Sequence, residues 1–282
     1  MKKFDYKKIM VHGGLFHADD VLCVAMARII NPSIEIERVF KVPENIADDT
    51  IICDIGGGRY DHHQADAEIR ETGYKYAACG LFFRDFWEDL FPTEKSAEKF
   101  LWDFIIPIEQ TDNGEAPKNP LSKFISSFNP TWDDSADADT AFMEAVSVME
   151  TLIKKQLKSA NAEKAAEDGV REAYSRCHES GVVILPQFMP WQNVICQTDD
   201  VKFVIYPSNR GGYNLQAVPI ELGRRGLRIP IPTDLPEIYP GECTFVHQAG
   251  FLASFESAEC ALYAARKLIK EESKEDSSLM AS

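Results

Sequence analysis

The stretch KIMVHGGLFHADD, residues 8–20, decides the fold. Its first five residues predict a buried strand, which ends at the glycine pair 13–14. Apolar residues then recur at helical spacing from Ala18 to Ile30. A buried strand, a glycine loop and a helix in this order are typical of a parallel α/β sheet.

The rest of the first half repeats this alternation of strands and helices. Residues 34–40 alternate as a strand does, and residues 50–55 predict a short apolar strand that stops at three glycines. Residues 77–90 and 94–108 have helical periodicity. We therefore expect residues 1–135 to form one domain built on a parallel sheet.

The second half begins with a long helical signal. Residues 138–177 predict a helical stretch that is broken near Asn161 and Gly169. We place this stretch in a connecting segment, residues 136–178.

Strand signals return after the connecting segment, among loops rich in proline and glycine. They lie at residues 182–185, 202–206, 214–219 and 243–247, and a helical pattern follows at 257–270. We expect residues 179–270 to form a smaller mixed α/β domain, and the charged or small residues 271–282 to be a frayed tail. The predicted fold class is thus α/β, with a parallel-sheet domain, a smaller mixed domain and the active site in the cleft between them.

The composition excludes several classes of protein. The 282 residues, 45% of them hydrophobic, can build large cores, which excludes a disordered chain. No apolar run approaches the ~18 to 20 residues of a membrane span, and no signal-peptide core follows the first methionine. Seven cysteines without a C-x-x-C pair indicate reduced thiols. We expect a cytoplasmic protein with no membrane partner.

The charge is strongly acidic but uneven. Thirty basic and 45 acidic residues give a net charge of −15, so the molecule has no overall field that would gather nucleic acid. Residues 202–228 are the basic exception, and we expect phosphate contacts there, although a solvated basic loop would look the same. The basic residues of this segment are Lys202, Arg210, Arg224, Arg225 and Arg228.

Histidines and aspartates gather at the ends of two predicted strands. Four of the six histidines lie within the first 63 residues, in HGGLFHADD (12–20) and DIGGGRYDHHQ (54–64). The carboxyl ends of parallel strands share one edge of a sheet, so the two clusters can converge. Their candidate residues are His12, His17, Asp19 and Asp20, then Asp54, Asp61, His62 and His63.

These residue types together favour a metal centre. Imidazole and carboxylate suit Mn, Fe, Co or Zn, and a carboxylate such as Asp54 can bridge two ions. Asp112, at the end of an apolar helix, is a third candidate element, although alone it would be an ordinary helix end. Any one of these histidines taken singly is more often a structural residue. The same alternative applies to His247, which follows an apolar strand.

The motifs, taken in chain order, resemble the melanocyte proliferating gene family, which is related to the DHH phosphoesterases. The resemblance runs from residue 12 to residue 251, nearly the whole chain. Its motifs are His-x4-His-x-Asp-Asp, Asp-x-Gly-Gly, Asp-His-His-Gln, Asp-Asn-Gly, FNPTW (128–132), LQAVP (215–219), RGLR (225–228) and His-x-x-Gly-Phe (247–251).

The resemblance implies a two-domain DHH-type fold with two divalent ions, Mn first and Fe, Co or Zn as alternatives. It implies a 3′ to 5′ exonuclease that acts on RNA or short oligonucleotides. His12 and His17 would hold one ion, Asp19, His62 and Asp112 the other, and Asp54 would bridge them. The catalytic set would be His63, facing the scissile phosphate, with Asp61, which orients it, and Asp20. The substrate contacts would be Arg224, Arg225, Arg228, His247, Gly250 and Phe251.

The chain departs from the family pattern at two places. DHH enzymes have an aspartate about where His17 stands, one residue nearer the first histidine. The family's Trp-Arg pair before Gln-Ala-Val-Pro is replaced in this chain by Tyr213, Asn214 and Leu215. The second departure concerns substrate contacts more than the metal centre.

Other functions remain open at this stage. The net charge of −15 favours a small phosphate compound, such as a dinucleotide or a pyrophosphate-like molecule, over long RNA. A metal-binding regulatory protein without turnover and a metal-dependent amide hydrolase are further alternatives. The sequence predicts no oligomeric state.

Overall fold

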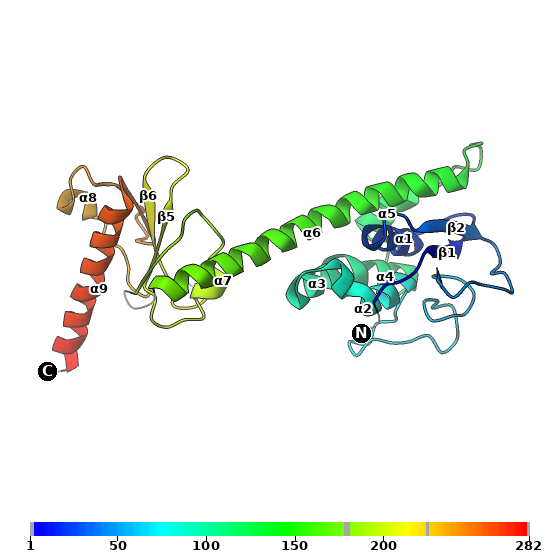
Figure 1. Cartoon of the computed structure of the whole chain (residues 1–282), viewed down its shortest axis with the longest axis horizontal. Helices are drawn as coiled ribbons and strands as arrows, with labels where there is room; N and C mark the ends of the chain where they lie inside the picture. Colours follow the sequence, from blue (N-terminus) through cyan, green and yellow to red (C-terminus); the bar gives the residue numbers. More distant parts are fainter. Residues whose placement is uncertain (1–2, 178–180, 224–225, 281–282) are drawn as a thin grey trace. The chain divides into compact units, whose positions relative to one another are not determined.

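The structure, a computed structural model, describes residues 3–177, 181–223 and 226–280. It forms two compact units, Met1–Asn161 (unit 1) and Ala162–Ser282 (unit 2). The division falls inside helix α6 (Ala138–Cys177), which contributes to both units (Figure 1).

The predicted breaks in α6 near Asn161 and Gly169 were wrong, because the helix is continuous. A single glycine within a helix costs only about 1 kcal/mol relative to alanine. Gly169 also has a packing reason: a Cβ atom there would lie 2.9 Å from the sulfur of Met189. Glycine at this position lets the helix approach the loop that carries Met189.

Unit 1 is built on a sheet of three parallel strands, as its sequence predicted. The strand order is β2 (Glu35–Val39), β1 (Lys8–His12), β3 (Thr50–Ile52). Helix α1 (Ala18–Ile30) follows the glycine loop, and all its residues from Ala18 to Ala27 are buried. Ten consecutive buried residues place the start of α1 inside the core, next to the carboxyl edge of the sheet.

Helices α2 (Ala78–Leu90), α4 (Ile106–Asp112) and α5 (Pro120–Ser126) of unit 1 pack against α1, and α3 (Glu94–Phe100) and a π-helical turn η1 (Leu101–Ile105) pack against α2. The single helix expected at residues 94–108 is therefore interrupted. Pro107 cannot donate a backbone hydrogen bond, and the wider η1 turn just before it accommodates this loss. The helix then continues to Asp112.

Unit 2 has a mixed sheet, as expected, but the sheet has five strands where the sequence predicted four. The order is β4 (Val182–Ile184), β5 (Phe203–Pro207), β6 (Tyr213–Ala217), β8 (Leu252–Phe255), β7 (Cys243–Val246), in which only β4 and β5 are parallel. Short helices α7 (Gln192–Ile195) and α8 (Leu235–Ile238) lie in its loops. Helix α9 (Ala258–Met280) extends through most of the segment that we expected to be frayed.

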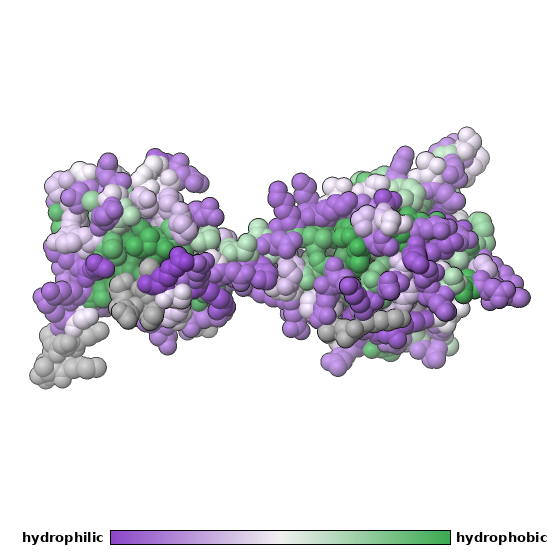
Figure 2. All heavy atoms as spheres, in the orientation of Figure 1, coloured by the Kyte–Doolittle hydropathy of each residue, from purple (hydrophilic) through white to green (hydrophobic). Residues whose placement is uncertain are grey.

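Each face of the unit 2 sheet carries a core. Phe203, Ile205 and Leu215 pack with Ala264 and Leu268 of α9. On the other face, Val204 joins a cluster with residues of α6 and with the buried Trp191. Hydrophilic residues cover much of the face of both units that Figure 2 shows. Within the described ranges, no helix combines the length and the hydropathy that a bilayer crossing requires.

Gly80 tests how unit 1 fixes α2 against α4. A Cβ atom at Gly80 would lie 1.6 Å from Oε1 of Glu109, which is fully buried. Glu109 accepts hydrogen bonds from Arg70 Nε (2.8 Å), Arg70 Nη2 (3.0 Å) and the backbone of Ala77 (3.1 Å). Gly80→Ala must displace this carboxylate and should lower the free energy of unfolding by about 3 kcal/mol.

Urea unfolding followed by circular dichroism measures this change. Gly58→Ala is the matched control, because a Cβ atom there meets nothing within 4 Å. It should shift the free energy by no more than about 0.5 kcal/mol. Equal effects of the two substitutions would contradict the proposed packing constraint.

Candidate metal centre

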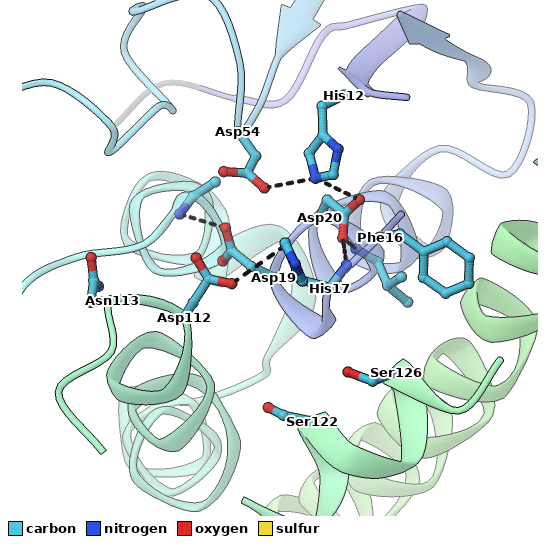
Figure 3. Close-up of polar contacts among 12 residues, drawn as sticks. His12, Phe16, His17, Asp19, Asp20, Asp54, Asp112, Asn113, Ser122 and Ser126 are labelled. Carbon is cyan, nitrogen blue, oxygen red and sulfur yellow. Dashed lines mark hydrogen bonds and ion pairs between the residues drawn. The ribbon is translucent and has the colours of Figure 1, made fainter. Parts of the chain in front are cut away.

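His12 and Asp54 lie side by side because two parallel strands end together. Met10 of β1 pairs with Ile52 of β3, and each candidate residue stands two positions further along its chain. Nε2 of His12 and Oδ2 of Asp54 are 3.4 Å apart (Figure 3). The strand register thus brings the two sequence clusters to one sheet edge.

Asp54 has an unusual backbone conformation. Its φ of 59° lies in the left-handed region, which aspartate tolerates better than most residues but still at a cost in energy. Its N–H donates to the carbonyl of Tyr60 at 2.8 Å, so the chain turns back toward the strand before residues 61–63. As a result Oδ1 of Asp54 lies 3.2 Å from Nε2 of His62.

Asp20 fixes the start of α1 and also contacts His12. Its Oδ1 accepts hydrogen bonds from the backbone N–H groups of His17 and Val21, each at 2.9 Å. Its Oδ2 lies 3.2 Å from Nε2 of His12. Burial raises the pKa of Asp20 to about 7, against the opposing effect of His12. Asp20 is therefore a positioning residue in this structure.

Asp19 ties α1 to the first turn of α2. Its carboxylate, which is fully buried, accepts hydrogen bonds from the N–H groups of Ala78 (3.0 Å) and Cys79 (2.8 Å). Helix α2 has no side-chain cap from its own N-cap residue, so Asp19 satisfies these helix-end donors. Burial, followed by the nearby Asp54 and Asp112, raises the pKa of Asp19 well above its usual value.

The end of α4 holds His62. Oδ2 of Asp112 lies 3.1 Å from Nε2 of His62, and Oδ1 of Asn113 lies 3.1 Å from Nδ1. Asn113 is itself fixed, because its Nδ2 donates to the carbonyls of Tyr76 and Glu109. We did not assign Asn113 a role from sequence. Its only signal there was its place in the Asp-Asn-Gly motif.

His63 is the most exposed of the four candidate histidines, with 64% of its side chain accessible. Oδ1 of Asp61 lies 2.8 Å from Nδ1 of His63, and Oδ2 accepts the N–H of Gly57 at 2.6 Å. Burial by itself would raise the pKa of Asp61, but these hydrogen bonds lower it below its usual value. Asp61 therefore stays ionised and holds the ring, whose Nε2 remains available to solvent or substrate.

The ligand atoms form three overlapping groups. They are His12, His17 and Asp54; Asp54, His62 and His63; and Asp19, His62 and Asp112, with the atoms of each group within 4.8 Å of one another. His17 is more exposed than His12 and His62, and its Nδ1 lies 4.0 Å from Oδ1 of Asp112.

The donor set fits divalent transition metals. Nδ1 of His12 contacts the carbonyl of Gly13 at 3.1 Å, and Nδ1 of His62 contacts Asn113. A hydrogen on Nδ1 of each ring leaves Nε2 as a metal ligand, directed at the carboxylates. Neutral imidazole with carboxylate is the ligand combination of Mn, Fe, Co and Zn sites.

The predicted substrate residues lie in unit 2 and have different surroundings. Arg224 and Arg225 lie outside the described residues. Arg228 donates to the backbone carbonyls of Val201 (2.7 Å) and Cys196 (3.3 Å), so in this structure its guanidinium stabilises loops.

His247 lies in a turn that Gly250 and Phe251 complete. The ring of Phe251 is 4.3 Å from that of His247, and Gly250 has a φ of +66° with its backbone close to Ile231. Nδ1 of His247 accepts the N–H of Ala249 at 3.1 Å, which leaves Nε2 as the donor of a neutral ring. The imidazole lines a hollow of about 670 Å³, whose other lining residues include Phe188, Tyr206, Arg210, Asn214 and Phe245.

Comparison with known proteins places the chain in a family. Residues 8–269 match the model MYG1_exonuc, described as an uncharacterised protein family (UPF0160). The MYG1 protein of Schizosaccharomyces pombe is 27% identical, over 93% of this chain and 97% of its own length. The MYG1 exonuclease of Homo sapiens is 25% identical, over 94% of this chain and 86% of its own length. The chain therefore belongs to the MYG1 family, which confirms the resemblance found in its motifs.

The chain is also distantly similar to solved structures, of which RecJ is an example. RecJ from Thermus thermophilus, crystallised with Mn²⁺, aligns with 95% of this chain and 52% of its own, at 12% identity and a TM-score of 0.32. A TM-score this low carries no argument about the present chain.

Protons should leave the site when a metal enters it. The hydrogen bond to Asp54 raises the pKa of His12 to about 9. Burial opposes the shift at His62, but Asp112 and Asp54 raise its pKa to about 11. With these pKa values both rings carry a proton on each nitrogen at pH 7 in the metal-free protein, and an imidazole must lose one of them before it can bind a metal ion. Mn²⁺ uptake should therefore release more protons at pH 7 than at pH 10.

Titration calorimetry in buffers of different ionisation enthalpy counts these protons. Heats of Mn²⁺ binding that do not depend on the buffer at pH 7 would show that the rings are already neutral.

Asn113→Leu tests the support of His62, because it removes the acceptor at Nδ1 of His62 without touching a carboxylate. It should weaken Mn²⁺ binding by about 10- to 100-fold.

Proposed function

We propose that this chain is a metal-dependent phosphodiester hydrolase, specifically a 3′ to 5′ exonuclease that acts on RNA or short oligonucleotides. Two divalent ions, most suitably Mn²⁺, with Fe, Co or Zn as alternatives, would be its cofactors. Membership of the MYG1 family supports nuclease activity, since several relatives carry the name exonuclease. The RNA substrate and the polarity of attack rest on the sequence resemblance.

The observation that carries this proposal is the position of the Asp54 carboxylate. Its two oxygens face different imidazoles, Oδ2 toward His12 and Oδ1 toward His62. Asp54 thus faces both groups of candidate ligands, so it would be shared between two ion sites if each group held an ion. The surrounding groups supply His17 on one side, and Asp19 and Asp112 on the other.

The bound ions would supply a water molecule of lowered pKa and Lewis acidity toward the phosphoryl oxygens. The chain supplies positioning. Asp20 holds His12, Asn113 holds His62, and the first turn of α2 holds Asp19. These three candidate ligands are thus fixed by neighbours, which is the preorganisation that two-metal chemistry requires.

His63 would act on the scissile phosphate. Asp61 fixes Nδ1 of the ring, so Nε2 is directed away from Asp61 and can donate to a nonbridging phosphoryl oxygen. Charge accumulates on these oxygens in the transition state, where a positioned donor has its greatest effect. The exposure of the ring leaves room for the substrate beside it.

Unit 2 would bind the terminal nucleotide. The hollow that His247 lines combines the exposed aromatic rings of Phe188 and Phe245 with polar side chains such as Asn214. Aromatic faces bind bases by stacking, and Nε2 of His247 can donate to a phosphate or sugar oxygen. The roles of Arg224 and Arg225 as phosphate contacts remain part of this proposal.

A small phosphate compound is the second candidate substrate, favoured by the net charge of −15. Rates on labelled oligonucleotides of two to twenty nucleotides distinguish the two. A rate that falls steadily beyond the shortest substrates favours the small compound.

Asp54→Asn tests the proposed centre directly. Asparagine also tolerates the left-handed backbone, so the fold should persist. The amide cannot bridge two ions with two anionic oxygens, so bound Mn²⁺ should fall from about two ions per chain and oligonucleotide hydrolysis should fall at least ~10³-fold. Elemental analysis and a fluorescent exonuclease assay measure the two effects.

Asp66→Asn is the matched control. Asp66 is an exposed residue of the neighbouring loop, so the same chemical change is made there at the surface. It should leave metal content and rate unchanged. Two tightly bound ions in Asp54→Asn would exclude the bridging role, and a purified wild-type protein that cleaves no phosphodiester with Mn²⁺ would refute the proposed function.

His247→Ala tests the contribution of unit 2. If His247 contacts the substrate mainly in the transition state, kcat should fall about 10- to 100-fold while metal content stays intact. The substitution also removes the acceptor for the N–H of Ala249 and should cost about 1 kcal/mol of stability.

His247→Asn separates these two effects, because its amide oxygen can accept the same N–H but places no donor where Nε2 stood. It should retain the melting temperature and still lose kcat. A normal kcat in both variants would remove His247, Gly250 and Phe251 from the substrate site.

A further inference from the structure

Five aspartates surround the candidate metal centre, so a polyanionic substrate needs cations there besides the metal ions. Those residues are Asp19, Asp20, Asp54, Asp61 and Asp112. Arg228, which the sequence suggested for this purpose, donates to two backbone carbonyls of its own unit. A cation of unit 1 that lies beside the metal ligands would meet the need more directly.

Such a cation lines a cavity next to the centre. The cavity measures about 210 Å³, and its polar lining consists of His17, Thr111, Asp112, Lys118, Ser122 and Ser126. A water molecule takes up about 30 Å³ in the liquid, so the cavity has room for a group much larger than one water. Figure 3 shows Ser122 and Ser126 on the side of His17 and Asp112 that faces α5.

The cavity adjoins both halves of the candidate metal centre. His17 belongs to the ligand group of His12, and Asp112 to that of His62. Nδ1 of His17 and Oδ1 of Asp112, on the cavity wall, are 4.0 Å apart. A ligand in the cavity would therefore lie directly beside a phosphodiester that is bound at the metal ions.

The polar groups on the α5 side of the cavity are hydrogen-bond donors. Nζ of Lys118 donates to Oγ of Ser126 at 3.3 Å, and Nδ2 of Asn119 donates to Oγ of Ser122 at 2.9 Å. Among the described residues, neither serine donates its own hydroxyl hydrogen to a protein acceptor. Ser122 is 4% exposed, so its hydroxyl is directed into the cavity rather than into bulk water.

An ammonium group with two hydroxyl donors is suited to an anion. Charge-assisted hydrogen bonds from such groups to phosphate oxygens are short and strong. A sugar hydroxyl would need acceptors as well as donors, and the acidic wall residue Asp112 belongs to the metal ligands. The donor-rich wall therefore favours a phosphate over a ribose.

We propose that this cavity binds the phosphate next to the scissile one, with Lys118 as the charged contact and Ser122 and Ser126 as hydroxyl donors. The inference rests on the proposed phosphodiesterase function and specifies its substrate: a molecule with at least two linked phosphates, such as an oligonucleotide. Neither the sequence motifs nor the family resemblance included Lys118.

Lys118→Met tests the inference, because it removes the ammonium group and keeps most of the side-chain length. KM for a trinucleotide should rise about tenfold, while the kinetics with bis(p-nitrophenyl) phosphate, which has one phosphate, should not change. Lys118→Arg should restore most of the trinucleotide affinity. Lys123→Met is the matched control, because Lys123 is an exposed lysine of α5 outside the cavity lining.

A binding measurement supplies a readout that does not depend on turnover. A fluorescent single strand with phosphorothioate links, which resist hydrolysis, is titrated by anisotropy at several salt concentrations. Loss of one phosphate contact should reduce the slope of log K against log salt by about 0.7 for Lys118→Met and leave it unchanged for Lys123→Met.

The possible results distinguish failure of the inference about Lys118 from failure of the proposed function. An equal loss of activity with the trinucleotide and with bis(p-nitrophenyl) phosphate would place Lys118 at the scissile phosphate. Equal effects of Lys118→Met and Lys123→Met would show only general electrostatics. Either result overturns the inference. If the wild-type protein cleaves neither substrate, the proposed function fails, and the salt slope alone then decides whether Lys118 contacts phosphate.

Discussion

The carboxylate of Asp54, held between the rings of His12 and His62, is the interaction on which the rest of unit 1 depends. Burial would favour its protonated form, but the two imidazoles lower its pKa to about 2. The residue remains an anion at neutral pH although it is almost fully buried. A left-handed backbone and the register of β1 with β3 are both needed to place it there. Positive charge beside Asp54, from protonated rings or from metal ions, is therefore what keeps this buried carboxylate ionised.

Helix ends supply the remaining constraints. Asp19 accepts the first N–H groups of α2, Asp20 accepts N–H groups at the start of α1, and Asn113, at the end of α4, contacts His62. Each of these groups would be unsatisfied without its partner, because helix ends leave several backbone groups unpaired. The core and the candidate site are therefore stabilised by the same hydrogen bonds. Arg70 and Glu109 extend this arrangement, since they fix α4 against the loop before α2.

The sequence was sufficient for features set by local pattern. Helix α1 has the predicted bounds, and the two histidine clusters converge because β1 and β3 are parallel neighbours. Features that depend on distant partners were not predictable. The packing reason for Gly169 within α6 is the contact with Met189, and Asn113 contacts a histidine 51 residues earlier in the chain. Strand β8 was missed because LASF is too short to show a clear alternation. The basic stretch 202–228 suggested phosphate contacts, but charge alone could not show that Arg228 points at carbonyl groups.

The burial of α1 has a consequence for motion. Its first turn carries Asp19 and Asp20, and the ten residues from Ala18 to Ala27 are all buried. Amides in such a segment exchange their hydrogens only when a large part of a domain opens, so they report the slowest fluctuations of a protein. The candidate ligands on α1 are thus anchored where the chain opens least often. Substrate entry and product release must instead involve more exposed parts of unit 1, such as the side chain of His17. The molecule combines a deeply anchored set of carboxyl groups with exposed imidazoles at its surface.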